Sequence, residues 1–258
     1  DTPTSLLEAS VIQWQWKEDV FPECDQFNGI HEGLVQSWKD IFPKKGEIYF
    51  AGALENNEDT GTLQYLASTA MEAGFSTRVL DMQALDLQNG RFFDPAGELV
   101  NRCFKLYPWE WMVDESPDGC LAEMEWLEPI WKLVMSNKAI LATLYELFPD
   151  SPYVLPCYLS RPRSGLFCKK PIFSREGHNV SVVDIRDWEE YVRIAETEGD
   201  YNTGAYVYQE YVEPTVYSGR YPVIGSWIIG GEAAGIGIRE NRMEVTDNLS
   251  EFVPHIIG

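Results

Sequence analysis

The stretch 47–80 constrains the fold of this chain more than any other part of its sequence. Residues 47–53 (EIYFAGA) predict a strand, residues 59–73 place their apolar side chains on one helical face, and residues 75–80 predict a second strand. Two strands joined through a helix lie parallel, and a parallel sheet needs helices to cover it. The sequence therefore predicts a β-α-β unit within a larger α+β protein.

The segments on either side of this unit carry other patterns. The Asn89-Gly90 pair favours a tight hairpin, and from residue 156 onward short strands indicate a mostly antiparallel α+β region. The predicted helices are 2–17 with Thr2 as N-cap, 25–41, 108–111, 123–134, 187–195, and 138–148 with Ile140, Leu141, Leu144, Leu147 and Phe148 turned inward. The predicted strands are 47–53, 75–80, 103–107, 166–173, 180–184, 205–212, 222–229 and 233–239, with a tight turn at Gly230-Gly231.

The chain is strongly acidic, with 41 Asp and Glu against 20 Lys and Arg and a formal net charge of −21. Most of this surface would repel a nucleic-acid backbone or an anionic membrane, whereas a cationic partner such as a polyamine is tolerated. The most apolar stretch, 223–238, is broken by glycines and a glutamate, so we expect no membrane-spanning segment. Five cysteines without a C-x-x-C pair and three scattered histidines indicate neither a disulfide framework nor a structural metal site, which fits a reducing cytoplasm.

Residues 167–180 (FCKKPIFSREGHNV) place a basic, glycine-bearing loop between two predicted strands. Strand alternation puts Lys169 and Lys170 on opposite faces, so that one of them can point into a site. The loop after them adds a hydroxyl, a guanidinium, a carboxylate and a residue without a Cβ, namely Ser174, Arg175, Glu176 and Gly177. A triphosphate with Mg²⁺ needs this set of groups, although a surface hairpin with unrelated polar residues has the same composition.

Two further basic residues could serve the same ligand. Lys138 precedes a predicted helix, whose N-terminal N–H groups favour a phosphate; a solvated first-turn lysine is the alternative. Arg239 ends a strand of small residues and could neutralise charge that moves between a phosphate and its acceptor; a salt bridge to Glu240 or to another neighbour is the alternative. The loop after Gly52 is acidic and lacks a G-x-G-x-x-G pattern, which argues against a nucleotide there.

Six stretches, in chain order, carry a more specific signal: DTPTSLLEA (1–9), FKLYPWEWM (104–112), SNKAIL (136–141), KKPIFSREGHNV (169–180), YQEYVEP (208–214) and PVIGSWIIGGEAAGIGIRE (222–240). Together they resemble the synthetase domain of the glutathionylspermidine synthase family. The resemblance implies an ATP-grasp fold of the α+β class with an inserted β-α-β substrate subdomain. We expect an N-terminal helical segment at 1–45, the β-α-β subdomain at 46–107 and the nucleotide-binding region at 108–258.

By this resemblance the protein is an ATP-dependent carboxylate–amine ligase that forms an amide through an acyl-phosphate, with ATP and Mg²⁺ as cofactors. Its partners would be a peptide-like carboxylate such as glutathione and an amine such as a polyamine. The motifs also imply a role for individual residues. Lys138, Lys170, Ser174, Arg175, Gly177 and the hinge residues Gln209, Glu210, Tyr211 and Val212 would bind ATP, Glu176 would bind Mg²⁺, and Arg239 would stabilise the transferring phosphoryl group.

Two parts of the family pattern are not met. A Glu-x-Asn metal motif is expected just upstream of the opening helix, so we expect the chain to be a truncated part of an active protein or a domain without turnover. No cysteine lies in an amidase motif. A polyamine could be held by Glu32 or by the Trp109-Glu110-Trp111 cluster, which core packing also explains. The remaining alternatives are a non-catalytic or regulatory nucleotide-binding domain of the same fold and a Trp-rich carbohydrate-binding or purely structural module.

Overall fold

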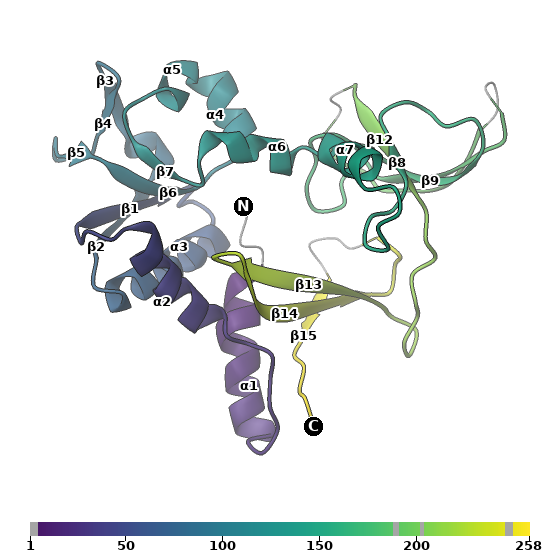
Figure 1. The fold of residues 1–258 in the computed structure, drawn as a ribbon, viewed down its shortest axis with the longest axis horizontal. Helices are drawn as coiled ribbons and strands as arrows, with labels where there is room; N and C mark the ends of the chain where they lie inside the picture. Colours follow the sequence, from purple (N-terminus) through teal and green to yellow (C-terminus); the bar gives the residue numbers. More distant parts are fainter. Residues whose placement is uncertain (1–4, 188–190, 202–203, 246–249) are drawn as a thin grey trace. The chain divides into compact units, whose positions relative to one another are not determined.

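The chain forms two units in the computed structural model (Figure 1). The structure describes residues 5–187, 191–201, 204–245 and 250–258. The first unit comprises 1–133, 224–238 and 252–258, and the second comprises 134–223 and 239–251. The segments expected from the sequence do not follow these limits, because 1–45 and 46–107 both fall in the first unit and 108–258 is shared between the two.

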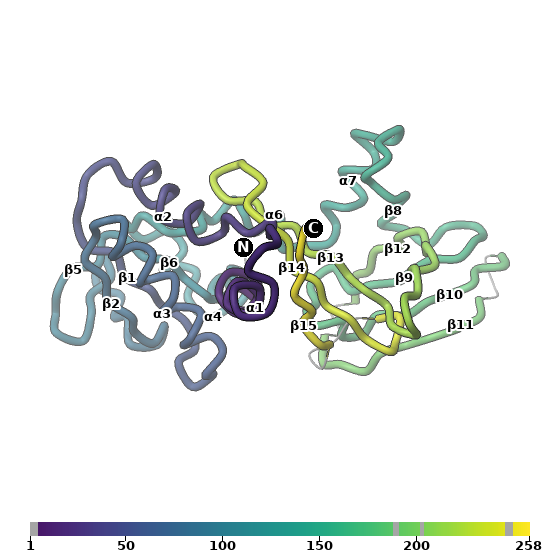
Figure 2. Tube along the Cα trace, turned by 90° about the horizontal axis from the view of Figure 1, so that it is seen from below, coloured from purple at the N-terminus to yellow at the C-terminus, as the bar shows by residue number. Residues whose placement is uncertain are grey.

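The first unit is built on a parallel sheet of order β2-β1-β6-β7 (Figures 1 and 2). Its strands are β1 (Glu47–Gly52), β2 (Ser76–Asp81), β6 (Arg102–Leu106) and β7 (Glu125–Leu127). Helix α3 (Asn57–Glu72) connects β1 to β2, and Asn56 caps it by accepting a hydrogen bond from the N–H of Glu58 at 2.9 Å. Because β1 pairs in parallel with both β2 and β6, the predicted β-α-β unit and the predicted returning strand are confirmed.

The side chains of β1 alternate between two cores, one on each face of this sheet. Ile48 and Phe50 point into a core formed with α2 (Ile30–Ile41) and α3. Tyr49 and Ala51 point into a second core on the opposite face. The aromatic members of that second core include Phe92, Trp109 and Trp126. A parallel strand buried on both faces is apolar throughout, which is the pattern that residues 47–53 display.

The first unit also contains shorter elements. They are the π-helix η1 (Glu8–Ile12), the helices α1 (Gln13–Val20), α4 (Trp109–Glu115) and α5 (Pro117–Cys120), the 3₁₀-helices η2 (Met82–Ala84) and η3 (Ile130–Lys132), and a small sheet of β3 (Asp86–Gln88), β4 (Arg91–Phe93) and β5 (Leu99–Val100). Asn89 and Gly90 join β3 to β4 with φ angles of 51° and 76°, so the predicted hairpin is confirmed.

The N-terminal helices differ from the prediction in their limits. Thr2, the predicted N-cap, lies outside the described residues. The predicted helix 25–41 begins only at Ile30, because Asp25 instead pairs with Ile257 in a β-bridge and Gly29 donates to the carbonyl oxygen of Ala234 at 2.7 Å. Within the described part of the chain, the structure contains no helix with the length and apolar character that a membrane crossing requires.

A third sheet, of order β13-β14-β15, contains β13 (Tyr221–Ile229), β14 (Glu232–Asn241) and β15 (Glu251–Val253). Gly230 and Gly231 join the first two strands with φ angles of 61° and 89°, values that glycine adopts without steric cost. The predicted tight turn at this position is therefore confirmed.

The second unit is built on a five-stranded sheet of order β11-β10-β9-β12-β8, as Figure 2 shows. Its strands are β8 (Cys157–Tyr158), β9 (Gly165–Pro171), β10 (Ser181–Ile185), β11 (Tyr191–Glu196) and β12 (Tyr206–Glu210), and the short helix α6 (Leu133–Ser136) precedes α7 (Ala139–Leu147). All four strand pairings are antiparallel, as the sequence predicts for this region. Ala142 of α7 packs on Cys157 and Val207, so the helix covers one face of the sheet.

Three helix predictions are wrong in whole or in part. Residues 191–195 belong to β11, which pairs with β10; residues 188–190 of that prediction lie outside the described part. Residues 123–134 contain β7, because Trp126 enters the second core as part of a strand. The third helix exists as α7, but Leu147 and Phe148 at its end are 64% and 56% exposed, since the helix stops there.

Candidate nucleotide site

The five-stranded sheet holds Lys169 and Lys170 on opposite faces. The Nζ atom of Lys170 donates a hydrogen bond to Oε1 of Gln209 on β12 at 2.7 Å. The Nζ atom of Lys169 lies 3.9 Å from the centroid of the Tyr206 ring. The predicted alternation is thus confirmed. Lys170 is directly opposite Val207, and so it shares the face that α7 partly covers.

Lys138, the N-cap residue of α7, contacts the loop that follows β9. Its backbone N–H donates to the carbonyl oxygen of Ile172 at 2.7 Å. Its Nζ atom donates to the carbonyl oxygen of Ser174 and, at 3.0 Å, to the hydroxyl of Ser174. Because Ser174 is only 8% exposed, these charge-assisted hydrogen bonds are shielded from water. Two of the sequence-predicted nucleotide residues are therefore in direct contact.

The loop itself has a tight turn at its tip. The N–H of His178 donates to the carbonyl oxygen of Arg175 at 2.9 Å, and the two residues between them, Glu176 and Gly177, have φ angles of 56° and 71°. Positive φ at both central positions is the mark of a type I′ turn. Gly177 adopts it freely, whereas Glu176 does so at a cost on the order of 1 kcal/mol. Such a strained residue in a polar loop is a reason to suspect a functional role for its side chain.

Glu176 can supply one oxygen ligand to Mg²⁺. Its Oε2 atom lies 3.8 Å from Nε2 of His178, and its side chain is about half exposed. Across the described ranges, no three His, Cys, Asp or Glu side chains are grouped so that they could hold a metal ion. Mg²⁺ commonly takes one or two protein carboxylates and completes its shell with phosphate oxygens and water. The residues therefore fit a Mg²⁺ that is bound together with a phosphate ligand.

The segment 209–212 leaves the sheet at the end of β12. The N–H groups of Glu210 and Tyr211 donate to carbonyl oxygens of neighbouring segments at 2.8 and 3.0 Å, so both are occupied by the sheet. Burial, together with a hydrogen bond from the Tyr211 hydroxyl to Glu244 at 2.9 Å, raises the pKa of Tyr211 to about 12. If this segment reads a nucleotide base, it does so through groups other than these two N–H donors.

Arg239 lies near the end of β14, in the part of that strand that belongs to the second unit. It stands on the three-stranded sheet, whereas Lys170 stands on the five-stranded one. Its neighbour Glu240 lies 4.0 Å from Arg220, which also contacts Glu251 at 2.5 Å. Glu240 therefore has an ion-pair partner of its own in Arg220, the residue just before β13.

A buried lysine in the first unit was missed as a functional candidate. Lys105 of β6 is 5% exposed, and its Nζ atom donates to the carbonyl oxygen of Tyr107 at 2.7 Å and lies 4.1 Å from the centroid of the Trp109 ring. Burial lowers its pKa to about 8, although Cys103 and Glu110 oppose this shift. Its only sequence signal is a lysine in an apolar strand.

Lys105 lies next to the Trp109-Glu110-Trp111 cluster, which the sequence offered as a wall of a polyamine pocket. Trp109 is 2% exposed and donates through Nε1 to the carbonyl oxygen of Glu128 at 3.1 Å, so it is a core residue. Lys105 already lies over its ring and interacts electrostatically with Glu110. Glu32, the other candidate, lies on α2. Trp109 of this motif thus packs against a cation that the protein itself supplies.

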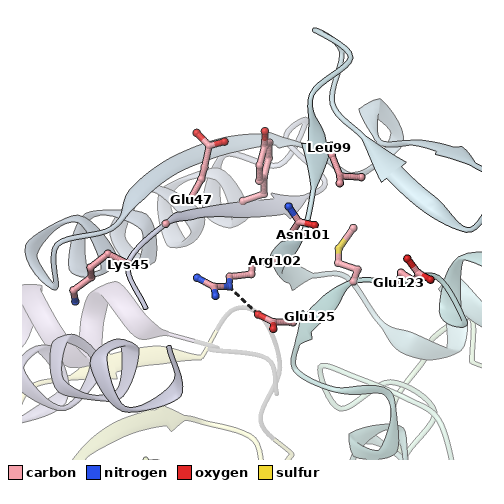
Figure 3. Close-up of a pocket in the computed structure, with 10 residues that line it drawn as sticks. Lys45, Glu47, Leu99, Asn101, Arg102, Glu123 and Glu125 are labelled. Carbon is pink, nitrogen blue, oxygen red and sulfur yellow. Dashed lines mark hydrogen bonds and ion pairs between the residues drawn. The ribbon is translucent and has the colours of Figure 1, made fainter. Parts of the chain in front are cut away.

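A cavity of about 650 Å³ lies in the first unit at the amino ends of β1, β6 and β7 (Figure 3). Arg102 and Glu125 form an ion pair in its wall at 2.8 Å, as Figure 3 shows. Glu47 accepts from Arg78 at 2.8 Å, and Lys45 donates to a carbonyl oxygen. Arg102, Glu125 and Glu47 thus have charged partners within the protein, and none of the predicted site residues lines the cavity.

A family model described as glutathionylspermidine synthase preATP-grasp matches residues 1–258 of this chain. The chain belongs to the glutathionylspermidine synthase family. A Haemophilus influenzae protein named "Putative acid--amine ligase" is 37% identical to this family member over 99% of the chain and 68% of its own length. Trypanothione synthetase of Crithidia fasciculata is 27% identical over 98% of the chain and 43% of its own length.

The bifunctional glutathionylspermidine synthetase/amidase of Escherichia coli is 25% identical, over 100% of this chain and 46% of its own length. The chain thus spans about two thirds of the first of these relatives and less than half of the other two. Among solved structures, a "Putative gamma-glutamylcysteine synthetase" from Methylobacillus flagellatus KT matches with a TM-score of 0.55 at 10% identity, over 89% of this chain and 75% of that one.

These findings confirm the family expected from the sequence and a mixed α/β fold of the synthetase type. The solved structure shares the fold alone at this level of identity. The three relatives by sequence are named as ligases or synthetases, so the family places this chain among the C–N ligases.

Proposed function

We propose that this chain carries the nucleotide-binding machinery of an ATP-dependent carboxylate–amine ligase of the glutathionylspermidine synthase type. The observation that carries the proposal is the meeting of Lys138 with the buried Ser174 at a loop whose tip is the Glu176-Gly177 turn. This arrangement offers a cation, a hydroxyl, close backbone approach and a carboxylate within one short segment, and Lys170 precedes that segment on β9. These are the groups that phosphoryl transfer requires.

In the proposed reaction the γ-phosphoryl group of ATP passes to a substrate carboxylate, which gives ADP and an acyl-phosphate. The amine nitrogen then attacks the acyl carbon, the amide bond forms, and inorganic phosphate leaves with the electron pair of the broken C–O bond. Lys138 and Lys170 would bind phosphate oxygens as point charges. Arg239 would stabilise charge on the transferring group, and Glu176 would hold a Mg²⁺ that neutralises the phosphates.

The first unit supports the idea of a substrate subdomain. Strand β2 pairs with one edge of β1, and β6 pairs with the other edge. The direction in which strands are added to the sheet therefore reverses between β1 and β6. Ligands of open parallel sheets bind outside the carboxyl ends of the strands at such a reversal. We therefore expect the carboxylate or amine substrate near the residues that follow Gly52 and Leu106. The chemistry of that substrate would be peptide-like or polyamine-like, as in the names of the relatives.

The test is Mg²⁺-dependent conversion of ATP to ADP by the protein translated from the complete reading frame that contains these 258 residues, with glutathione plus spermidine and then with other acids and amines. Turnover that needs both an acid and an amine supports the ligase. ATP binding without turnover on any pair favours a non-catalytic nucleotide-binding domain.

Lys170→Ala and Lys169→Ala form a matched pair of variants, because the two lysines are adjacent but lie on opposite faces. We expect Lys170→Ala to abolish ATP binding and Lys169→Ala to preserve it. Equal ATP affinity in the two variants would contradict the assignment of Lys170.

A further inference from the structure

A second segment, 197–201, holds the 174–179 loop in place. It continues the antiparallel pairing of β10 and β11, whose last pair is Ser181 with Glu196. Beyond that pair, the N–H of Thr197 donates to the carbonyl oxygen of Val180 at 2.9 Å, and the N–H of Asn179 donates to a carbonyl oxygen of the same segment at 3.5 Å. The loop that carries the proposed phosphate contacts is thus tied to a segment that has no nucleotide motif.

The side chain of Thr197 fixes the conformation of the turn. Its hydroxyl donates to the carbonyl oxygen of Gly177 at 2.5 Å and accepts from the N–H of Val180 at 3.0 Å. Gly177 is the second central residue of the type I′ turn, so this hydroxyl sets the orientation of the peptide unit that follows it. Because the neighbouring N–H groups belong to the same strained turn, their directions depend on this contact.

Asn179 makes the second connection. Its Nδ2 donates to the carbonyl oxygen of Gly199 at 2.9 Å, and its Oδ1 accepts from the N–H of Tyr201 at 2.8 Å. Both hydrogen-bonding ends of the amide are therefore used by one segment. Asn179 also has a φ angle of 55°, a conformation that asparagine tolerates better than other residues with a Cβ.

Gly199 allows the two segments to approach this closely. A Cβ at this position would lie 2.4 Å from Cβ and 2.7 Å from Cγ of His178, and 2.9 Å from Oδ1 of Asn179. Any side chain here would push the loop away from its support. Glycine at 199 is thus required by the packing of the loop and not by its own backbone angle.

We propose that Thr197 and Asn179 are positioning residues that hold the 174–179 loop in its phosphate-binding conformation before a nucleotide arrives. This inference rests on the proposed function and adds to it two residues to which the family motifs assign no contact with the nucleotide. A loop that adopts its binding conformation only part of the time lowers the apparent affinity by that fraction. Three residues of this loop, Glu176, Gly177 and Asn179, have positive φ, so the isolated loop would populate other conformations.

The experiment measures binding of Mg²⁺-ATP and of AMP to the 258-residue chain by isothermal titration calorimetry. Thr197→Val removes the hydroxyl at nearly constant shape, and Thr197→Ser keeps the hydroxyl as the matched control. We expect Thr197→Val to raise the Kd for ATP about five- to tenfold, because the variant lacks the hydroxyl that donates to Gly177 and accepts from Val180. AMP lacks the β- and γ-phosphates, so its Kd should be unchanged, and Thr197→Ser should bind ATP as the wild type does.

Asn179→Gly is an independent test of the proposal, because glycine keeps the positive φ at this position but lacks both side-chain hydrogen bonds. A weaker affinity for ATP with an unchanged affinity for AMP supports the positioning role of Thr197 and Asn179. An affinity for ATP equal to that of the wild type in both Thr197→Val and Asn179→Gly overturns it, and so does an equal loss for ATP and AMP, which indicates general damage. Absence of ATP binding in the wild type is a different result, because it overturns the proposed function itself.

Discussion

Replacement of Lys105 by methionine should change how the stability of the protein depends on pH. The pKa of this lysine falls from its usual 10.5 to about 8 in the folded chain, with burial as the main cause. A depressed pKa of this size means that burial of the charged form costs about 3 kcal/mol at neutral pH. Between about pH 8 and 10.5 the unfolded chain binds more protons than the folded chain, so the free energy of unfolding of the wild type rises with pH in that window.

The measurement is the free energy of unfolding by urea at several pH values, for the wild type and for Lys105→Met. The wild type should gain about 3 kcal/mol relative to the variant between neutral pH and about 10.5, and other titrating groups cancel in this comparison. Lys39→Met is the matched control, because Lys39 is exposed. If the two curves of wild type and Lys105→Met remain parallel, the buried, charged lysine described here does not exist in solution.

Three further predictions concern separate parts of the chain. Arg239→Ala should bind ATP as the wild type does, but its turnover rate should fall about 100-fold or more, because a group that acts on the transferring phosphoryl is needed only in the transition state. A rise in the Kd for ATP would instead indicate a role in binding. Burial lowers the pKa of His255, and its Nε2 accepts a hydrogen bond from the N–H of Phe27 at 3.2 Å. The free energy of unfolding should therefore fall as the pH drops below about 6.5. His255→Gln, compared with the wild type by urea unfolding at acidic and neutral pH, should lack this fall. Gly52→Ala should destabilise by about 1–3 kcal/mol, because its Cβ would lie 3.1 Å from the carbonyl oxygen of Leu106; an unchanged Tm would refute the close packing.

The parts of the fold that the sequence predicted are those with a sustained local pattern. β1, α3 and β2 were found because 47–80 combines a short apolar run, a helical stripe and a second apolar run. β7 was missed because it has only three residues, and both β7 and β11 form strands only through pairing with a partner strand. Backbone hydrogen bonding to another segment overrides local propensity in such places.

In the candidate site, too, some residues could be placed from the sequence and others could not. Lys170 could be placed on one face of its strand from alternation alone, and its hydrogen bond to Gln209 agrees with that placement. The contact of Lys138 with Ser174 could not be derived from spacing, because it depends on how α7 packs on the sheet. Thr197 carried no signal at all, since a threonine hydroxyl acquires its role only from the carbonyl oxygen that it meets.

The first unit is assembled from three separate stretches of sequence, and this has a consequence for synthesis on the ribosome. When residues up to 133 have emerged, the core around α2 still lacks Ala234, and Asp25 still lacks its bridge partner Ile257. The strands of the second unit's sheet all lie within 157–210 and are available earlier. The order of completion is therefore the reverse of the order along the chain. The part of the first unit before residue 134 must wait, with some of its apolar surface uncovered, until residues 224–258 have been made.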